Sequence, residues 1–303
     1  MKRFLPTIIL VVVCIAGFWY ASSQNFFKKE EEATTKPLVT VKKEDITAFS
    51  LKTGTDTVEL QLKDNVWSMS KPSALPLSTM DVDGWTSSFV SLTQDGEVDA
   101  NPSDLAGFGL ATPASEYTVT LKNGSTQTVQ VGNPLPIAGY SYVKLKDAPN
   151  VYKVSDTTLQ GLQKQPIDFM KKMPIEFTYS DVQSLAMTWN GASKTLTKSD
   201  TTKTASESTW KFGEKELQGT DATAVLDKAL LLSTDQLAKP ASQVTAGAPE
   251  LKVDVKQSKE GKETTESYTG KVDGDNVWIV KQGDTWAYAV AKTTVQEMFD
   301  ALQ

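Results

Sequence analysis

The clearest pattern of apolar and polar positions in this chain occurs twice, 136 residues apart. Residues 142–162 (YVKLKDAPNVYKVSDTTLQGL) align at that shift with residues 278–298 (WIVKQGDTWAYAVAKTTVQEM). In each copy the alternation predicts a strand, a turn and a second strand, and a helix follows. Because order, spacing and residue class agree, the two stretches indicate a duplicated structural unit.

The first half of the chain leads up to its copy through a regular series of elements. Residues 57–69 (TVELQLKDNVWSM) alternate around a Lys-Asp-Asn turn and predict two strands. A helix is predicted over 79–92, because apolar residues recur there at helical spacing. Residues 118–132 (TVTLKNGSTQTVQVG) predict a hairpin, since Asn-Gly at its centre is typical of a tight turn.

The second half of the chain repeats this series. A strand begins near Asp181, and residues 208–213 (STWKFG) correspond to residues 65–70 (NVWSMS). A helix is predicted over 221–232, at a shift of about 140 from the first helix. Residues 273–276 (DGDN) predict a hairpin turn just before the second copy begins.

These patterns predict an α+β fold of two duplicated lobes, each an antiparallel β-sheet with one or two helices packed on one face. The first lobe is expected at 44–170 and the second at 175–303. Trp189 and Trp286 have no aromatic counterpart in the other lobe, so we expect them to be exposed and to form a candidate interaction surface. The remaining tryptophans of the repeat are expected in the cores: Trp67, Trp85, Trp210 and Trp278.

An uncharged apolar run near the N-terminus, residues 4–20 (FLPTIILVVVCIAGFWY), follows Lys2 and Arg3. Its length is at the short end for a membrane-spanning helix, and its aromatic end is typical of a membrane interface. We expect residues 1–23 to form a single-pass anchor behind which the body of the protein lies outside the cytoplasm, because basic residues stay inside.

This run also allows two other interpretations. A cleavable signal peptide is possible, because Ala21-Ser22-Ser23 provides small residues at a suitable spacing. A lipoprotein signal fits less well, since Val13 rather than a small residue precedes Cys14. Residues 24–43 contain KKEEEATTKP and are expected to be a solvated tether between membrane and body.

Composition removes several classes of chemistry. The 303 residues include no histidine, so Ser-His-Asp, Cys-His and histidine-ligated zinc sites are excluded. Cys14 is the only cysteine, and an internal disulfide is therefore impossible. The net charge of −6, with both signs mixed, gives no basic patch for nucleic acid. We expect no cofactor, no nucleic-acid partner and no enzymatic activity.

Two short motifs are similar to parts of enzymes that work without histidine. Ser208-x-x-Lys211 and Lys52-Thr53-Gly54 resemble fragments of penicillin-binding serine acyltransferases, but their order is reversed and the first falls on a predicted strand. Carboxylate-based hydrolysis stays open as an alternative, because the pairing of two carboxylates is spatial and invisible in a sequence.

A loosely calcium-like run occupies the loop after the first helix. Its possible oxygen ligands are spaced at alternate positions: Asp95, Glu97, Asp99 and Asn101. Ala100 stands where such a loop needs glycine, and Ala106 where it needs an acid. A solvated loop is the preferred interpretation, with a weak cation site as the alternative.

Several motifs of the first half together resemble a bacterial family called domain of unknown function 4340. They are a "W-x-x-x-x-P" opening at 67–72, a "GL-x-x-P" element at 109–113, the Asn-Gly turn, and a "Y-x-V" strand at 152–154. The resemblance covers about residues 45–165 and is diffuse afterwards, where Lys239-Pro240 stands in the place of the "GL-x-x-P" element. It implies an N-terminal membrane segment and an accessory role beside ABC-type exporters, with no established activity.

The expected function follows from the anchor, the tether, the duplication and this resemblance. We expect a membrane-anchored, extracytoplasmic and non-enzymatic protein that serves an ABC-type transport or cell-envelope system. A module that binds cell-wall polysaccharide or peptide, through Trp189 and Trp286, is the first alternative, and the carboxylate-based hydrolase is the second.

Overall fold

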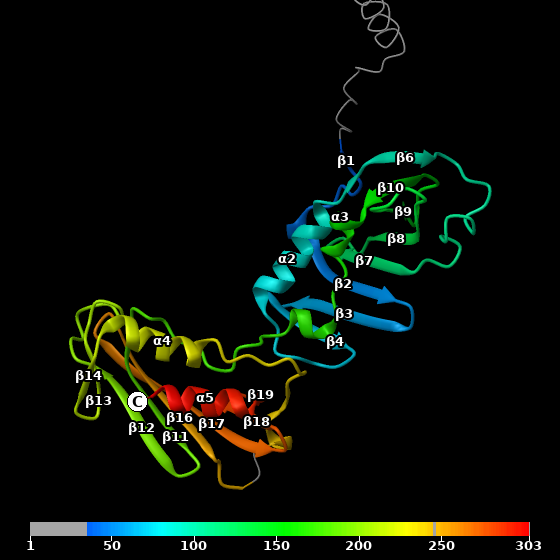
Figure 1. Ribbon diagram of the computed structural model, residues 1–303. Coiled ribbons are helices and arrows are strands. Elements are labelled where there is room, and N and C mark those ends of the chain that lie inside the picture. The colour runs from blue at the N-terminus through cyan, green and yellow to red at the C-terminus, as the bar shows by residue number, and fades with distance from the viewer. Residues whose placement is uncertain (1–34, 245–246, 303) are drawn as a thin grey trace, which may run out of the picture. The chain divides into compact units, whose positions relative to one another are not determined.

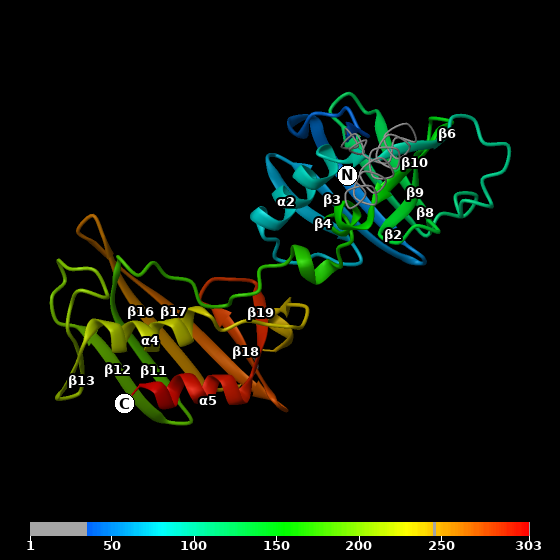
Figure 2. The same cartoon turned by 45° about the horizontal axis from the view of Figure 1, so that its top comes forward.

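The computed structural model describes residues 35–244 and 247–302, which form a mixed α+β structure with two large antiparallel sheets and few helices (Figures 1 and 2). The predicted anchor at 1–23 and the first part of the tether lie outside the described residues. Within the described ranges, no helix combines the length and apolar character needed to span a membrane.

The first sheet has eight strands in the order β4-β3-β2-β7-β8-β9-β10-β6. Its strands are β2 (Ile46–Thr53), β3 (Asp56–Lys63), β4 (Val66–Lys71), β6 (Gly96–Asp99), β7 (Ser115–Leu121), β8 (Thr126–Pro134), β9 (Tyr140–Leu145) and β10 (Val151–Ser155). The helices α2 (Thr79–Val90) and α3 (Asp156–Gln160) belong to this part of the chain, as does the small pair β1 (Lys36–Pro37) and β5 (Thr93–Gln94). A short 3-10 helix, Lys43–Asp45, leads into β2.

Aromatic packing joins α2 to the first sheet. The Trp85 ring on α2 stacks on Phe49 of β2, with 4.1 Å between the ring centroids, and both side chains are buried. Trp67 of β4 and Phe169 of the 3-10 helix Pro166–Phe169 complete the cluster around Phe49 at 5.2 and 5.7 Å. Burial of several large rings in one cluster is a major source of core stabilisation.

The second sheet has nine strands in the order β14-β13-β12-β11-β16-β17-β18-β19-β15. Its strands are β11 (Val182–Trp189), β12 (Ala192–Lys198), β13 (Trp210–Phe212), β14 (Lys215–Leu217), β15 (Lys239–Pro240), β16 (Leu251–Lys259), β17 (Lys262–Asp273), β18 (Asn276–Lys281) and β19 (Trp286–Ala291). The helices α4 (Gly219–Leu230) and α5 (Lys292–Ala301) lie across one face of it, and the 3-10 helix Ala241–Gln243 follows β15 (Figure 2).

The strand orders of the two sheets correspond except at one edge. In each, a hairpin pair (β2–β3 or β11–β12) is followed on one side by four consecutive antiparallel strands and then by an outermost strand from the connection after the first helix. On the other side of the hairpin the first sheet has one strand, β4, and the second sheet has two, β13 and β14. The helix of the first part, α2, begins 140 residues before α4, and both helices have 12 residues. The α+β class and the antiparallel sheets are therefore confirmed.

The tight turns form where local chemistry predicts them. Asp64 and Asn65, between β3 and β4, have φ angles of 51° and 62°, a left-handed conformation that Asp and Asn tolerate better than most residues. Gly124, between β7 and β8, has a φ of 82°, and Gly274, between β17 and β18, has 59°. All three predicted hairpins are confirmed.

Most of the tryptophans predicted in the cores are buried. Trp85 and Trp210 are 1% and 0% exposed, Trp278 is 3% exposed, and Trp67 is half-buried. Trp278 belongs to a small cluster separate from the main core of the second sheet, together with Val280, Ala287 and Ala289. The segment after β15 packs against this cluster through Ala241 and Val244.

Candidate functional site

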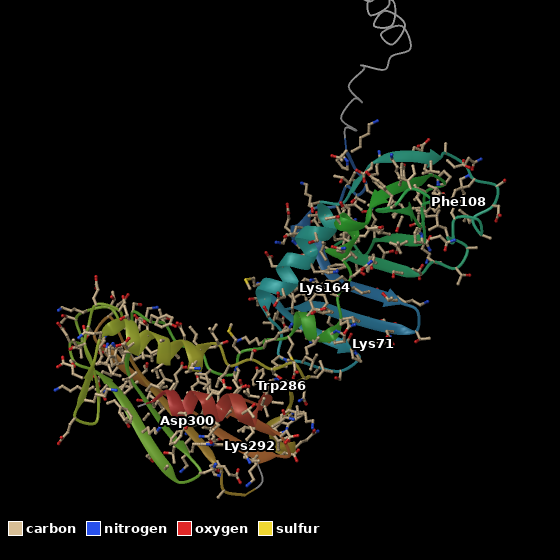
Figure 3. The ribbon with its side chains drawn as sticks, viewed as in Figure 1. Lys71, Phe108, Lys164, Trp286, Lys292 and Asp300 are labelled. Atoms are coloured by element: carbon tan, nitrogen blue, oxygen red, sulfur yellow. The ribbon has the colours of Figure 1, made fainter. Side chains whose placement is uncertain are left out.

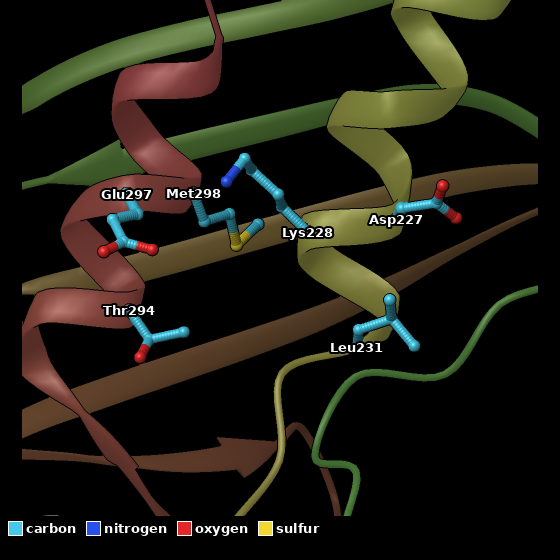
Figure 4. Close-up of a pocket in the computed structure, with 6 residues that line it drawn as sticks. All are labelled: Asp227, Lys228, Leu231, Thr294, Glu297 and Met298. Atoms are coloured by element: carbon cyan, nitrogen blue, oxygen red, sulfur yellow. The ribbon is translucent and has the colours of Figure 1, made fainter.

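A pocket of about 210 Å³ lies between the two helices on the second sheet (Figure 4). Helix α4 and the residue that ends it line one side, and α5 lines the other. The lining residues are Asp227, Lys228, Leu231, Thr294, Glu297 and Met298. None of these six residues was predicted as a site residue from the sequence.

The sequence of the two helices explains why a pocket can form there. Helix α4 buries mostly small side chains against the sheet, among them Ala222, Val225 and Ala229. Helix α5 buries Met298 completely, so its thioether lies at the floor of the pocket between the helices. Leu231 is 68% exposed at the rim and presents apolar surface there. The floor and the rim are therefore apolar.

The walls of the pocket carry charges of both signs. Figure 4 shows the Lys228 side chain reaching toward α5, while the Glu297 carboxylate lies on the α5 side. Within the described residues, neither group takes part in an ion pair or a side-chain hydrogen bond. Asp227 differs, because its carboxylate accepts a hydrogen bond from the Tyr179 hydroxyl. One ammonium and one carboxylate therefore remain available to a ligand.

Trp189 helps to position the α5 wall of this pocket. Its indole Nε1 donates a hydrogen bond of 2.7 Å to the Gln296 Oε1 atom, and Gln296 Nε2 donates one of 2.9 Å to Asp300. Trp189 is only 2% exposed, so the predicted exposure was wrong. The reason is the alternation in β11, which places Leu185, Met187 and Trp189 on the core face beneath α5.

Trp286, the other tryptophan of the predicted surface, is half-buried at the start of β19 (Figure 3). Its backbone position is opposite Pro240 of β15. Trp189 has almost no surface to contribute beside it, so the structure leaves Trp286 as the single tryptophan of that pair with a partly accessible ring.

Replacing Trp189 with phenylalanine is expected to lower the free energy of unfolding by about 1–2 kcal/mol, because the buried side chain loses its hydrogen bond to Gln296 and part of its packing in the core. A double-mutant cycle with Gln296→Met isolates the bond itself, and we expect a coupling of about 1 kcal/mol in urea unfolding. Strictly additive effects of the two substitutions would show that the bond does not hold α5.

The residues of the acyltransferase-like motif have structural partners. Ser208 is 1% exposed; its Oγ donates to the Thr209 carbonyl at 2.8 Å and accepts from the Asp200 backbone N–H at 3.0 Å. Lys211 is exposed on β13, and Lys52 lies at the end of β2. The Ser208 hydroxyl is buried, donates one hydrogen bond and accepts another, so it stabilises the local backbone. This geometry gives it no access to a substrate.

The carboxylates of the calcium-like run each bind a different partner within the protein. Asp95 accepts from the Ser155 backbone N–H at 2.9 Å, Glu97 accepts from Asn150 at 2.8 Å, and Asp99 accepts from the Asn101 backbone N–H at 3.0 Å. In the ranges that the structure describes, no three acidic or cysteine side chains gather in a way that could hold a metal ion. The run acts as an edge strand and its loop.

The "GL-x-x-P" element is a loop clamped onto the first sheet. The Phe108 carbonyl accepts the backbone N–H of Asn133 at 2.9 Å, and Gly109 has a φ of 69°. A Cβ at Gly132 would lie 2.2 Å from that same carbonyl oxygen, so only glycine fits in β8 at this point. The Phe108 ring meets Tyr142 of β9 edge-on, with 5.0 Å between the centroids. The motif therefore serves packing.

Lys239-Pro240 does not occupy the equivalent place in the second sheet. These two residues form β15, which pairs with β19 in the way that β6 pairs with β10. The counterpart of the clamped loop is the segment after β15, and the prediction that aligned Lys239-Pro240 with the "GL-x-x-P" element was wrong.

The protein is therefore an α+β protein with two antiparallel sheets, and the motifs that the sequence analysis singled out have packing or turn roles in it. The family described as domain of unknown function (DUF4340) matches residues 67–248, and the chain belongs to this family. The match begins at Trp67 in β4 and extends past α4, so it reaches further into the second sheet than the motifs in the sequence suggested. Comparison with curated proteins and with solved structures found no match.

Proposed function

We propose that this protein is a non-enzymatic, membrane-anchored component that serves an ABC-type transport or cell-envelope system from outside the cytoplasm. The observation that carries the proposal is the α4–α5 pocket, whose apolar floor and rim adjoin two unpaired opposite charges among the described residues. Such a combination is typical of surfaces that receive a side chain of another protein. The apolar run at 4–20 and the charged tether support a position at the membrane.

The finer architecture is part of the same proposal, namely two duplicated lobes behind an N-terminal transmembrane helix. Its support is the strand order, which the two sheets share apart from the additional edge strand β14, and the agreement of buried positions in α2 and α4 at a shift of 140. The matched pairs are Val82 with Ala222, Trp85 with Val225, Thr86 with Leu226, Phe89 with Ala229 and Leu92 with Leu232. A duplicated unit would place both helices in this register on their sheets.

The anchor is tested by fractionation of cells that express the full chain. We expect the protein to stay with the membranes after an alkaline carbonate wash, and a variant that lacks residues 1–23 to appear in the soluble fraction. A control variant with residues 24–34 replaced by a Gly/Ser linker should still sediment. A full chain that washes off, or is shortened at its N-terminus, would contradict the anchor.

The partner is tested by purifying a C-terminally tagged full chain from detergent-solubilised membranes. We expect an integral membrane transporter to co-purify, and expect the amount to depend on the tagged chain. Repeated recovery of the chain alone, under detergent conditions that keep other membrane complexes intact, would contradict the proposal.

A cell-wall binding module is a second candidate, and the half-buried ring of Trp286 is the observation that favours it. Aromatic rings often provide stacking surfaces for partly apolar ligands. Co-sedimentation of the full chain with purified wall material, and its loss in Trp286→Ala, would support this function. Absence of sedimentation would remove it.

A further inference from the structure

The α4–α5 pocket has a counterpart in the first part of the chain that is closed. Helix α2 corresponds to α4 at a shift of 140, and the end of α3 corresponds to α5 at a shift of 136. At these shifts Ser88 matches Lys228 and Gly161 matches Glu297. One helix–helix contact therefore has two small residues, Ser88 and Gly161, where the other has two long side chains of opposite charge, Lys228 and Glu297.

The small pair explains the closed contact. A Cβ at Gly161 would lie 3.1 Å from the Ser88 Oγ atom and 3.2 Å from its Cβ, so the end of α3 packs directly on α2. At the matching place in the second sheet, Lys228 and Glu297 line an opening of about 210 Å³. The next residue in each helix differs much less between the two contacts. Leu162 and Met298 match at the shift of 136, and both are apolar and fully buried.

The pocket is small, and this size limits what it can hold. Sites for small molecules usually enclose about 300–1,000 Å³, which is more than this opening provides. A volume near 210 Å³ suits one or two side chains of a peptide. The 68% exposure of Leu231, which matches Ser91 in the first helix, adds apolar surface at the rim for such a side chain.

We propose that this pocket is the docking site for a peptide segment of a protein partner. The segment places one leucine- or methionine-sized side chain against Met298 and Leu231, a carboxylate near the Lys228 ammonium, and a basic group near the Glu297 carboxylate. The charges fix the direction of the segment, because reversing it would bring like charges together. This inference rests on the proposed function, in which the protein acts through a partner.

The test uses the purified full chain in detergent micelles and fluorescently labelled peptides. Each probe has a central leucine, with a glutamate three or four residues to one side and a lysine three or four residues to the other. Control peptides carry asparagine in place of leucine, or glutamine in place of both charges. We expect saturable binding of the probes by fluorescence anisotropy and at least about tenfold weaker binding of either control.

The decisive variant is Lys228→Ser/Glu297→Gly, which installs the residues of the first helix pair and leaves the net charge unchanged. We expect it to weaken probe binding at least about tenfold. The matched control is Lys252→Ser/Glu214→Gly, which makes the same exchanges at exposed positions of β16 and the β13–β14 turn, and should bind within about twofold of the parent. Equal binding by both double variants would overturn the proposal, as would the failure of every probe at about 1 mM.

Leu231→Ser keeps the test decisive if the double variant does not fold. This position is largely exposed, so the substitution should leave the circular dichroism spectrum unchanged and weaken the probe by about fivefold or more. Unchanged affinity would overturn the proposal.

Co-purification from membranes separates this inference from the function on which it rests. If the parent chain recovers a transporter and the pocket variants recover it equally well, the pocket is not the docking site and the function stands. If the parent chain recovers no transporter, the proposed function fails, whatever the peptides show.

Discussion

Gly132→Ala is expected to destabilise the first sheet by about 3 kcal/mol, as overpacking against rigid backbone does. The new methyl group would lie 2.2 Å from the Phe108 carbonyl oxygen and 3.2 Å from the Gly109 carbonyl carbon, and neither can move without the whole loop. Leu110, which is 3% exposed, would leave its buried position together with the loop. Urea unfolding and amide hydrogen exchange over residues 106–114 measure the loss.

Gly84→Ala provides the matched control for this substitution. Gly84 lies within α2, and a Cβ there has no neighbouring atom within 4 Å. Alanine is favoured over glycine in helix interiors by about 1 kcal/mol, so we expect Gly84→Ala to be neutral or stabilising. If Gly132→Ala behaved in the same way, the close approach of the clamped loop to β8 would be contradicted.

Trp85→Ala is expected to cost about 4 kcal/mol, the second large effect. The substitution removes a side chain that is 1% exposed and stacked on Phe49, and it leaves a cavity that the sheet on one side cannot fill. Hydrogen exchange in β2 and β3 is the suitable measurement, because a chain with two sheets need not unfold in a single transition.

Trp286→Ala is the comparison for that prediction, since it removes the same side chain from a half-buried position. We expect it to cost about 1 kcal/mol or less in the second sheet, because less apolar surface is lost from the interior. Similar losses for the two tryptophans would show that Trp85 does not organise the core of the first sheet.

The sequence could predict elements that depend on neighbours along the chain. The turns at Asn65, Gly124 and Gly274 need residues that tolerate a positive φ, and that requirement is local. The strands follow from period-2 alternation, and the helices from the spacing of apolar residues. The duplicated order of these patterns also anticipated the α+β class and the antiparallel sheets.

The exposure of Trp189 was predicted wrongly because the comparison between repeats was used in place of the strand alternation. Its exposure was predicted from the absence of an aromatic partner in the other repeat, although alternation in β11 places it with Leu185 and Met187. That period was available in the sequence and indicates the core face. The hydrogen bond to Gln296, 107 residues further along the chain, could not be predicted in the same way.

The sequence by itself determined the hairpin turns, the longer helices and the strands with clear alternation, because each depends on residues close together in the chain. It also determined, through the missing histidine and the single cysteine, which chemistry is impossible. Only the tertiary structure decided that Lys228 and Glu297 line an opening while Ser88 and Gly161 close one. The space between two helices about 70 residues apart depends on how both pack on a shared sheet, and no local pattern encodes that distance.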